Sequence, residues 1–261
     1  MADSLIHPTA IIDPSAHLAE GVEVGPYSVV GANVNIGAGS VLKSHVVIEG
    51  HTTIGENNTF FPFSAIGQIT QDLKYVGEPT ALIIGNNNTF RENTTIHRGT
   101  TEEVPTRIGN HNLFLSYAHV AHDCQVGNHC ILSNNATLGG HCKVGDYAII
   151  SGLSGAHQFC HIGEHSLIGG CTKIVQDVPP FTIVDGNPAA VRSLNMVGLQ
   201  RRGFSEQTRR AMKKAYKKLF LSKKNNLSEL TEELAGSEFA SDANVARMIT
   251  FIRTSERGVI R

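Results

Sequence analysis

A cluster of reactive side chains lies between Tyr117 and Cys130, where the sequence reads YAHVAHDCQVGNHC. These fourteen residues include three histidines, one aspartate and two cysteines. Histidine and cysteine are common ligands of tetrahedral zinc, whereas a histidine beside a carboxylate is a common form of general base. The third possibility is that these side chains only pack or face solvent. The element that positions each residue decides among the three.

A repeat of six residues covers about two-thirds of the chain and positions these side chains. From Ile6 to Ile174 every sixth residue is apolar, except Asp72, Glu78 and Glu102. The next position is often glycine, and the fourth position after the apolar residue is usually small. No helix has this period. The pattern predicts a triangular solenoid, mainly β, in which three hexads form a coil of eighteen residues and coils stack about 4.8 Å apart.

The repeat separates the cysteines from the histidines. Cys124, Cys130, Cys142 and Cys160 all occupy the small inward phase, where cysteine acts as a compact apolar residue. A zinc site needs converging thiolates rather than thiols at separate corners of a wall, so we expect no metal here. All five cysteines lie between Cys124 and Cys171, an odd count that suits a reducing compartment.

Residues eighteen apart stack in such a solenoid. His122, Gly140 and Gln158 therefore form one column, and Asp123, His141 and Phe159 form the adjacent one. Because His122 and Asp123 are in neither inward phase, we expect both to face outward. A histidine base, a carboxylate that fixes its tautomer and a glycine N–H facing a developing oxyanion together suit acyl transfer. His119 belongs to the same group of columns, whereas we expect four other histidines to be ordinary surface residues: His17, His111, His129 and His165.

Two interruptions and a tail depart from the repeat. Insertions at about 67–83 and 97–107 keep the six-residue phase, so they are predicted to be loops that leave the solenoid and rejoin it. We expect the catalytic solenoid to span 1–187 and a helical domain to span 188–261. Apolar residues at helical spacing between Ala211 and Phe220 alternate with lysines, and further helices are expected near 226–229 and 244–253.

Charge is balanced overall but concentrated locally. The chain has 22 basic and 23 acidic residues, which argues against a general nucleic-acid binder. The span from Arg201 to Lys224 nevertheless holds ten basic residues and one acid, Glu206, so an acidic partner is expected there. The N-terminus has no signal-peptide pattern and no segment is long and apolar enough to span a membrane, so we expect a soluble, cytoplasmic protein.

The chain resembles a known family through motifs spread over its whole length. It is similar to the acyl-carrier-protein-dependent UDP-N-acetylglucosamine O-acyltransferases that begin lipid A synthesis, a branch of the hexapeptide-repeat transferases. The motifs that carry the resemblance are TQDLKYVGEPT (70–80), TIHRGT (95–100), AHVAHDC (118–124), NNATLGGH (134–141), HQFC (157–160), GGC (169–171), QDVPPF (176–181) and QRRGFS (200–205). The resemblance also implies that the β-helix is left-handed.

The resemblance implies specific roles for site residues. His122 would be the general base, Asp123 its partner and the Gly140 N–H the oxyanion donor. The sugar and acyl chain would be positioned by Asp72, Lys74, His119, His141 and Gln158. His157 would lie beside the acyl groove, Gly170 would leave room for a long chain, and the nucleotide would be bound by Asn195, Arg201 and Arg202. Val197 departs from relatives that carry an acid near the nucleotide.

The same resemblance implies partners and leaves alternatives open. The expected substrates are UDP-N-acetylglucosamine and an (R)-3-hydroxyacyl carrier protein, the latter docking on the basic helical face. We expect a homotrimer whose sites are shared between chains and that needs no cofactor. The rivals are a trimeric zinc carbonic anhydrase using His119, His122 and His141, a non-catalytic scaffold, and an acetyl-CoA-dependent transferase. Acyl length and a 3-hydroxyl versus a 3-amino acceptor stay undecided.

Overall fold

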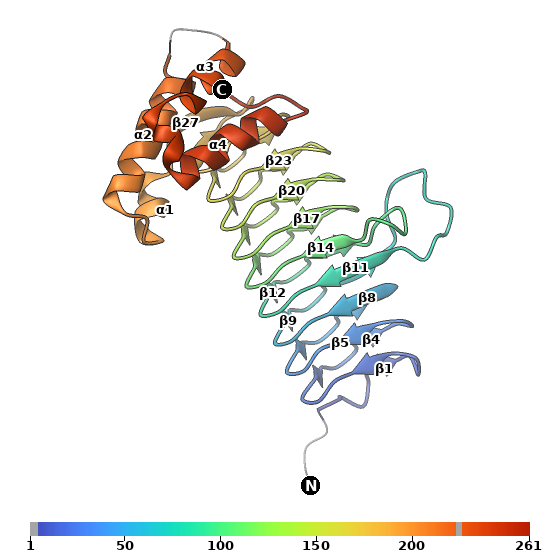
Figure 1. The fold of residues 1–261 in the computed structure, drawn as a ribbon. Helices are drawn as coiled ribbons and strands as arrows, with labels where there is room; N and C mark the ends of the chain where they lie inside the picture. The colour runs from blue at the N-terminus through green and yellow to red at the C-terminus, as the bar shows by residue number, and fades with distance from the viewer. Residues whose placement is uncertain (1–4, 223–225) are drawn as a thin grey trace.

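The computed structural model describes residues 5–222 and 226–261 as a stack of short parallel strands that ends in a group of helices (Figure 1). Lys223 and Lys224 of the basic span lie outside the described residues. No helix in the described ranges is both long and apolar enough to cross a bilayer.

Three sheets form the walls of the solenoid. The first, in spatial order, contains β1 (Ile11–Ile12), β4 (Val29–Val30), β7 (Val47–Ile48), β10 (Ala65–Gln68), β13 (Thr95–His97), β16 (His119–Val120), β19 (Thr137–Leu138), β22 (Gly155–Ala156) and β25 (Lys173–Ile174). The second contains β2 (His17–Leu18), β5 (Asn35–Ile36), β8 (His51–Ile54), β11 (Ala81–Ile84), β14 (Thr106–Ile108), β17 (Gln125–Val126), β20 (Lys143–Val144) and β23 (His161–Ile162). The third contains β3 (Glu23–Val24), β6 (Val41–Leu42), β9 (Thr59–Phe60), β12 (Thr89–Phe90), β15 (Leu113–Phe114), β18 (Ile131–Leu132), β21 (Ile149–Ile150), β24 (Leu167–Ile168), β26 (Thr182–Asp185) and β27 (Ala190–Leu194).

The pairing register confirms the coil length predicted from the repeat. Val30 pairs with Ile48 and Val120 with Leu138, an interval of eighteen residues in each case. The interval lengthens to thirty where Ile66 pairs with Ile96, and to twenty-four where Ile96 pairs with Val120. The extra residues are multiples of six, so the irregular segments 69–80 and 98–105 leave the solenoid without disturbing its phase.

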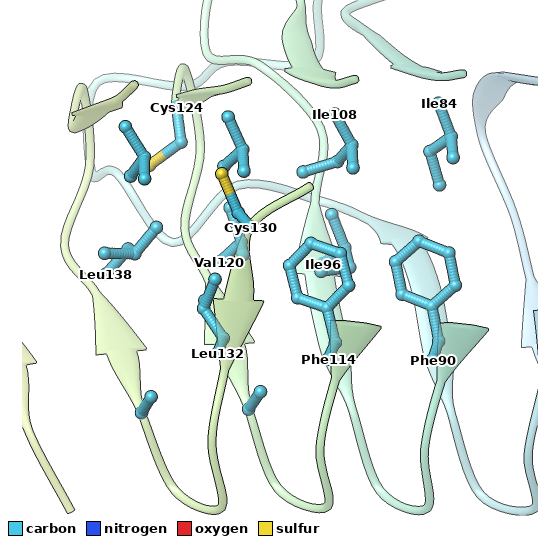
Figure 2. Packing of buried hydrophobic residues seen from close by; sticks show 14 of the residues in the cluster. Ile84, Phe90, Ile96, Ile108, Phe114, Val120, Cys124, Cys130, Leu132 and Leu138 are labelled. Carbon is cyan, nitrogen blue, oxygen red and sulfur yellow. The ribbon is translucent and has the colours of Figure 1, made fainter. Parts of the chain in front are cut away.

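The in-phase apolar residues form a continuous core inside the three walls (Figure 2). Phe60, Phe90 and Phe114 stack with centroids 4.8 Å apart, because their positions coincide on successive coils. Cys124, Cys130, Cys142 and Cys160 are buried free thiols in the same core, as the inward phase predicts. Burial raises the pKa of Cys130 and of Cys160 to about 12, which keeps both thiols protonated.

The helices pack around a second core at the C-terminal end of the stack. They are α1 (Met196–Arg201), α2 (Glu206–Phe220), α3 (Leu227–Ala235), the short 3₁₀ helix η1 (Glu238–Ser241) and α4 (Ala243–Thr254). Helix α2 buries Met212, Ala215, Tyr216 and Leu219 and exposes Lys213, Lys214 and Lys217, so its predicted amphipathic character is confirmed.

Two segments after residue 187 belong to the solenoid rather than to the helical group. Strand β27 pairs antiparallel with β26, and Ile260 is buried in the core of the solenoid. The last coil would otherwise expose its apolar interior and an unpaired strand edge, which explains why the chain returns to cover it.

Two leucines, Leu73 inside the first insertion and Leu82 in the strand that follows it, give a matched test of this packing. Leu82 is fully buried at an inward position, whereas the Leu73 side chain is 99% exposed. Leu82→Ala should lower the free energy of unfolding by about 2 to 5 kcal/mol through lost burial and a residual cavity. Leu73→Ala should change it by less than about 0.5 kcal/mol. Urea unfolding measures both, and equal effects would contradict the core described above.

Candidate active site

The site is built on a corner of the solenoid between β16 and β17, where His122 and Asp123 form the turn. Asp123 has a positive φ of 60°, a left-handed conformation that aspartate tolerates better than most residues. Neither residue is part of the solenoid core, as the outward phase predicts, yet both are buried, with 8% and 4% of their surface accessible. They point away from the solenoid core, but the two insertions cover them.

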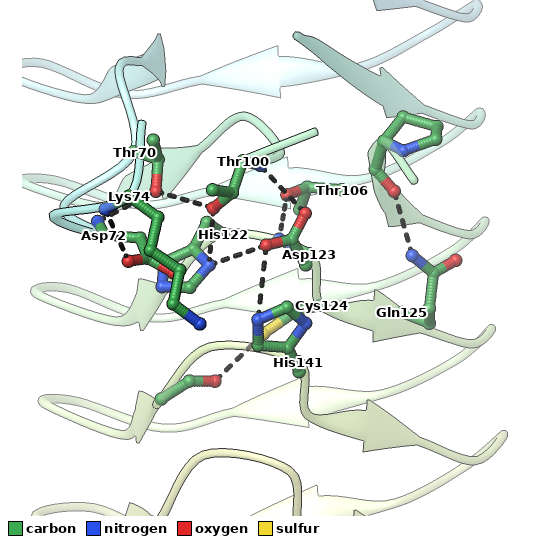
Figure 3. A network of polar contacts seen from close by, with 12 residues as sticks. Thr70, Asp72, Lys74, Thr100, Thr106, His122, Asp123, Cys124, Gln125 and His141 are labelled. Carbon is green, nitrogen blue, oxygen red and sulfur yellow. Dashed lines mark hydrogen bonds and ion pairs between the residues drawn. The ribbon is translucent and has the colours of Figure 1, made fainter. Parts of the chain in front are cut away.

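The His122 imidazole is held by its neighbour's carboxylate. His122 Nδ1 lies 2.7 Å from Asp123 Oδ2 (Figure 3). The other oxygen, Oδ1, accepts a hydrogen bond of 2.9 Å from the Thr100 backbone N–H. With Nδ1 donating to a carboxylate, the neutral ring leaves Nε2 as a proton acceptor. This is the arrangement that a general base requires.

A second imidazole shares the same carboxylate. His141 Nε2 lies 3.5 Å from Asp123 Oδ2, and its ring packs edge-on against His122 with centroids 5.2 Å apart. Its other face stacks on Phe159 one coil further on, as the eighteen-residue spacing predicts. Burial lowers the pKa of His141, and the charge of Asp123 partly opposes this effect.

Gly140 lies directly against the base. A Cβ atom at this position would come within 2.4 Å of His122 Cε1, so only glycine fits beside the ring. Gly140 is buried, and its N–H donates to no other group in the described part of the chain. A buried backbone N–H without an acceptor costs free energy, unless a ligand accepts its hydrogen bond. The Gly140 N–H is therefore available to a bound substrate.

The first insertion brings Asp72 and Lys74 to the open side of His122 (Figure 3). The Lys74 backbone N–H donates to Asp72 Oδ1 over 3.0 Å and is the largest cause of the lowered pKa of that carboxyl. Proximity of His122, Lys74 and His141 lowers the Asp72 pKa further. Asp72, His122 and His141 also offer ligand atoms within 4.8 Å of one another, a set that could hold a metal ion.

His119 belongs to the neighbouring wall, where its Nδ1 lies 2.7 Å from Thr95 Oγ1. Burial lowers its pKa, and proximity to His122 adds to that effect. It packs edge-on against His97, a buried histidine in the TIHRGT motif that the six-residue repeat does not single out. Nor does the repeat predict a site role for Thr70 and Thr100, at the edges of two quoted motifs.

Gln158 lies one coil beyond Gly140 on the same corner, where the backbone N–H of the next residue, Phe159, donates to the Gly140 carbonyl oxygen over 2.9 Å. His157 is exposed, and its Nδ1 lies 3.1 Å from the Gln158 carbonyl oxygen. A Cβ atom at Gly170 would meet only the Gly152 carbonyl oxygen, at 3.5 Å, so a substituent could be accommodated there. Gly170 therefore leaves open space on the outer wall.

The residues expected to bind the nucleotide contact another corner of the solenoid. Asn195 caps α1 by accepting from the Gly198 N–H, and it donates to the His165 carbonyl oxygen. Arg202 donates to the Tyr147 carbonyl oxygen over 3.0 Å and lies over the Tyr147 ring, while Arg201 is exposed. Within one chain these three are not brought to the His122 corner.

The structure contradicts the prediction that His165 is a surface residue. It was expected at the surface, but only 7% of it is accessible because Arg202 and Phe204 cover it. Burial, followed by the charge of Arg202, lowers its pKa to about 4. His111 and His129 stack with Tyr147 in the same column.

Comparison with known proteins finds relatives that match over nearly the full chain. Residues 177–260 match a family model described as UDP-N-acetylglucosamine O-acyltransferase, domain 2, and residues 3–38 and 105–140 match bacterial transferase hexapeptide repeats. An acyl-[acyl-carrier-protein]–UDP-N-acetylglucosamine O-acyltransferase of Akkermansia muciniphila is 57% identical, over 97% of this chain and 98% of the relative. A protein of the same name from Saccharophagus degradans is 52% identical, over 99% and 100%.

Solved structures give the same result. The LpxA structure from Acinetobacter baumannii matches with a TM-score of 0.95 and 45% identity, covering 99% of this chain and 100% of that one. The UDP-N-acetylglucosamine O-acyltransferase of Moraxella catarrhalis matches with a TM-score of 0.93 and 44% identity, with the same coverage. The chain belongs to the UDP-N-acetylglucosamine O-acyltransferase family. The fold is a left-handed parallel β-helix with a C-terminal helical part.

In this member of the UDP-N-acetylglucosamine O-acyltransferase family, buried His97 makes stability depend on pH. Burial lowers its pKa from 6.5 to about 4, so between these values the unfolded chain binds a proton that the folded chain does not. Stability from this group is therefore complete above pH 6.5 and is lost as pH falls towards 4, by up to about 3 kcal/mol. His97→Gln should show a smaller loss between pH 7 and 4.5 in urea unfolding. The exposed control His17→Gln should behave as the parent, and equal pH dependence of all three would contradict the assignment.

Proposed function

We propose that this protein transfers an (R)-3-hydroxyacyl chain from acyl carrier protein to the 3-hydroxyl of UDP-N-acetylglucosamine, the first step of lipid A biosynthesis. The observation that carries the proposal is the buried His122–Asp123 pair, whose Nε2 is left to accept a proton beside the unused Gly140 N–H. The names of the full-length relatives support the same reaction.

The transfer proceeds by direct attack. His122 Nε2 takes the proton from the sugar 3-hydroxyl as its oxygen bonds to the thioester carbon. The Gly140 N–H donates to the oxyanion that develops on the carbonyl oxygen. Collapse of this intermediate breaks the carbon–sulfur bond, and the departing thiolate receives the proton from the imidazolium. Asp123 orients the ring and stabilises its charged form, and no cofactor enters the reaction.

The surrounding side chains suit the positioning of two polar substrates. Asp72 and Lys74 provide opposite charges at the mouth of the site, and His119 and His141 have pKa values lowered by burial, which keeps them neutral and able to bind hydroxyl groups. We place the acyl chain along the wall formed by His157, Gln158 and Gly170. The open space at Gly170 fits a longer chain.

The proposed active form is a homotrimer. One corner of the solenoid carries exposed apolar side chains on every second coil: Tyr27, Phe63, Tyr117 and Leu153, each at least 58% exposed. Such an apolar stripe favours association with another copy. Association would also explain why Asn195, Arg201 and Arg202 occupy a corner away from the base in their own chain, since they can then serve a neighbour's site.

The carrier protein is proposed to dock on α2. Lys213 and Lys217 are exposed and have no partner among residues 5–222 and 226–261, whereas Lys218 pairs with Glu233 and Arg210 with Glu206. Acyl carrier proteins are strongly acidic, so the unpaired cations supply complementary charge. Both this partner and the free cysteines favour a cytoplasmic location.

The alternative function is a zinc-dependent carbonic anhydrase, because the site contains side chains that could bind a metal ion. That enzyme would use His119, His122 and His141, whereas the metal-capable cluster among the described residues contains Asp72 with His122 and His141. Elemental analysis distinguishes the two, since a stoichiometric metal would overturn the acyltransferase assignment. Mass spectrometry of products from a ladder of hydroxyacyl carrier proteins, with acetyl-CoA as a parallel donor, separates the transferases and fixes acyl length.

Removal of the base tests the mechanism. His122→Ala should lower kcat of acyl transfer by at least about 100-fold, the usual contribution of a general base. The assay follows the 3-O-acylated product by mass spectrometry.

The control is the mass of the assembly and its thermal unfolding, which should match the parent. A variant that keeps full activity would indicate a non-catalytic role for this corner.

Charge reversal on α2 tests carrier docking. Lys213→Glu with Lys217→Glu should raise KM for the acyl carrier protein about tenfold at low salt, because opposite charges steer and hold the partner. The difference should shrink at high ionic strength. Lys43→Glu with Lys143→Glu changes net charge equally on the solenoid and should leave KM unaltered. Equal effects of both pairs would exclude a specific docking face.

A further inference from the structure

Two threonine hydroxyls connect the insertions to the catalytic pair (Figure 3). Thr100 Oγ1 lies 3.0 Å from His122 Nδ1 and 3.0 Å from Thr70 Oγ1. Thr70 Oγ1 in turn accepts from the Asp72 backbone N–H over 3.0 Å. Both threonines are buried, with 5% and 6% of their surface accessible. A continuous chain of hydrogen bonds therefore links the base to the acid at the site mouth.

The chemistry of the donors fixes a direction for this chain. Since Nδ1–H points to the Asp123 carboxylate, Thr100 Oγ1 can only share that hydrogen as a second acceptor. The Thr100 hydroxyl is then free to donate to Thr70, which also accepts from Asp72 N–H. The Thr100 backbone N–H meanwhile holds Asp123 Oδ1, so one residue contacts both members of the pair.

The far end of the first insertion is anchored separately. Arg98 donates to the Gly67 carbonyl oxygen and to the Tyr75 hydroxyl, and lies over the Tyr75 ring. A Cβ atom at Gly67 would lie 2.2 Å from the Glu49 carbonyl oxygen, so the base of the insertion is also close-packed. These contacts hold the insertion at Gly67 and Tyr75. The part of the insertion nearest to His122 is held instead by the hydrogen bonds of Thr70.

We propose that Thr70 and Thr100 form a hydroxyl bridge that fixes the His122 ring and Asp72 in one geometry, with Thr100 as a positioning residue of the general base. This rests on the proposed acyl transfer. The bridge makes the two insertions part of the catalytic apparatus rather than a cover alone.

Threonine-to-valine variants test the bridge, because valine keeps the shape and removes the hydroxyl. Thr100→Val should lower kcat about tenfold, the effect of losing one hydrogen bond to a charged pair, while KM for UDP-N-acetylglucosamine changes less than threefold. Thr100→Ser keeps the hydroxyl and should recover at least half of the parent kcat. Thr70→Val should also lower kcat, and the double variant should fall no further than Thr100→Val, because Thr70 acts through Thr100.

Thr80→Val is the matched control. Thr80 is buried at the end of the same insertion, but its hydroxyl has no partner within the described ranges, so kcat should stay within twofold of the parent. An unchanged kcat in Thr100→Val, multiplicative losses in the double variant or failure of serine to restore activity would each overturn the bridge. The proposed reaction would still stand if His122→Ala were inactive in the same assay.

Discussion

The hydrogen-bonded ladder between successive coils is the constraint on which the rest of the structure depends. Each strand from β1 to β25 pairs in parallel with the strand one coil away, so a residue has a fixed neighbour at an interval of eighteen, or of thirty and twenty-four across the two insertions. The ladder therefore determines which side chains touch. It stacks Phe60 on Phe90 in the core, and it places Gly140 and His141 beside His122 and Asp123 at the corner of the solenoid.

The insertions add what a regular solenoid cannot provide. A corner of the solenoid would leave His122 and Asp123 in water, where a hydrogen bond to a carboxylate has little effect. Residues 69–80 and 98–105 bury the pair and supply Thr100 and Asp72 to it. Because both insertions add whole hexads, the coils on either side keep their register. The ladder fixes the positions of the site residues, and the two insertions provide the low-dielectric environment around them.

The parts that follow the repeat could be predicted from sequence, and the parts that leave it could not. The phase alone assigned the buried cysteines and brought His122, Asp123, Gly140 and His141 together. It says nothing about Thr70, Thr100 or His97, whose partners depend on loop paths with no period. It likewise failed for His165, since covering by the helical part is a long-range effect. The return of Ile260 to the solenoid core has no local signal either.

In the proposed reaction His122 Nε2 receives the proton of the sugar 3-hydroxyl while Nδ1 is held by Asp123. A crystal structure with bound UDP-N-acetylglucosamine tests it most directly. We expect the 3-hydroxyl oxygen within hydrogen-bond distance of Nε2, about 2.6 to 3.2 Å, with the contact to Asp123 retained. A sugar whose 3-hydroxyl lies out of reach of His122, or a metal ion between His122 and Asp72, would contradict it.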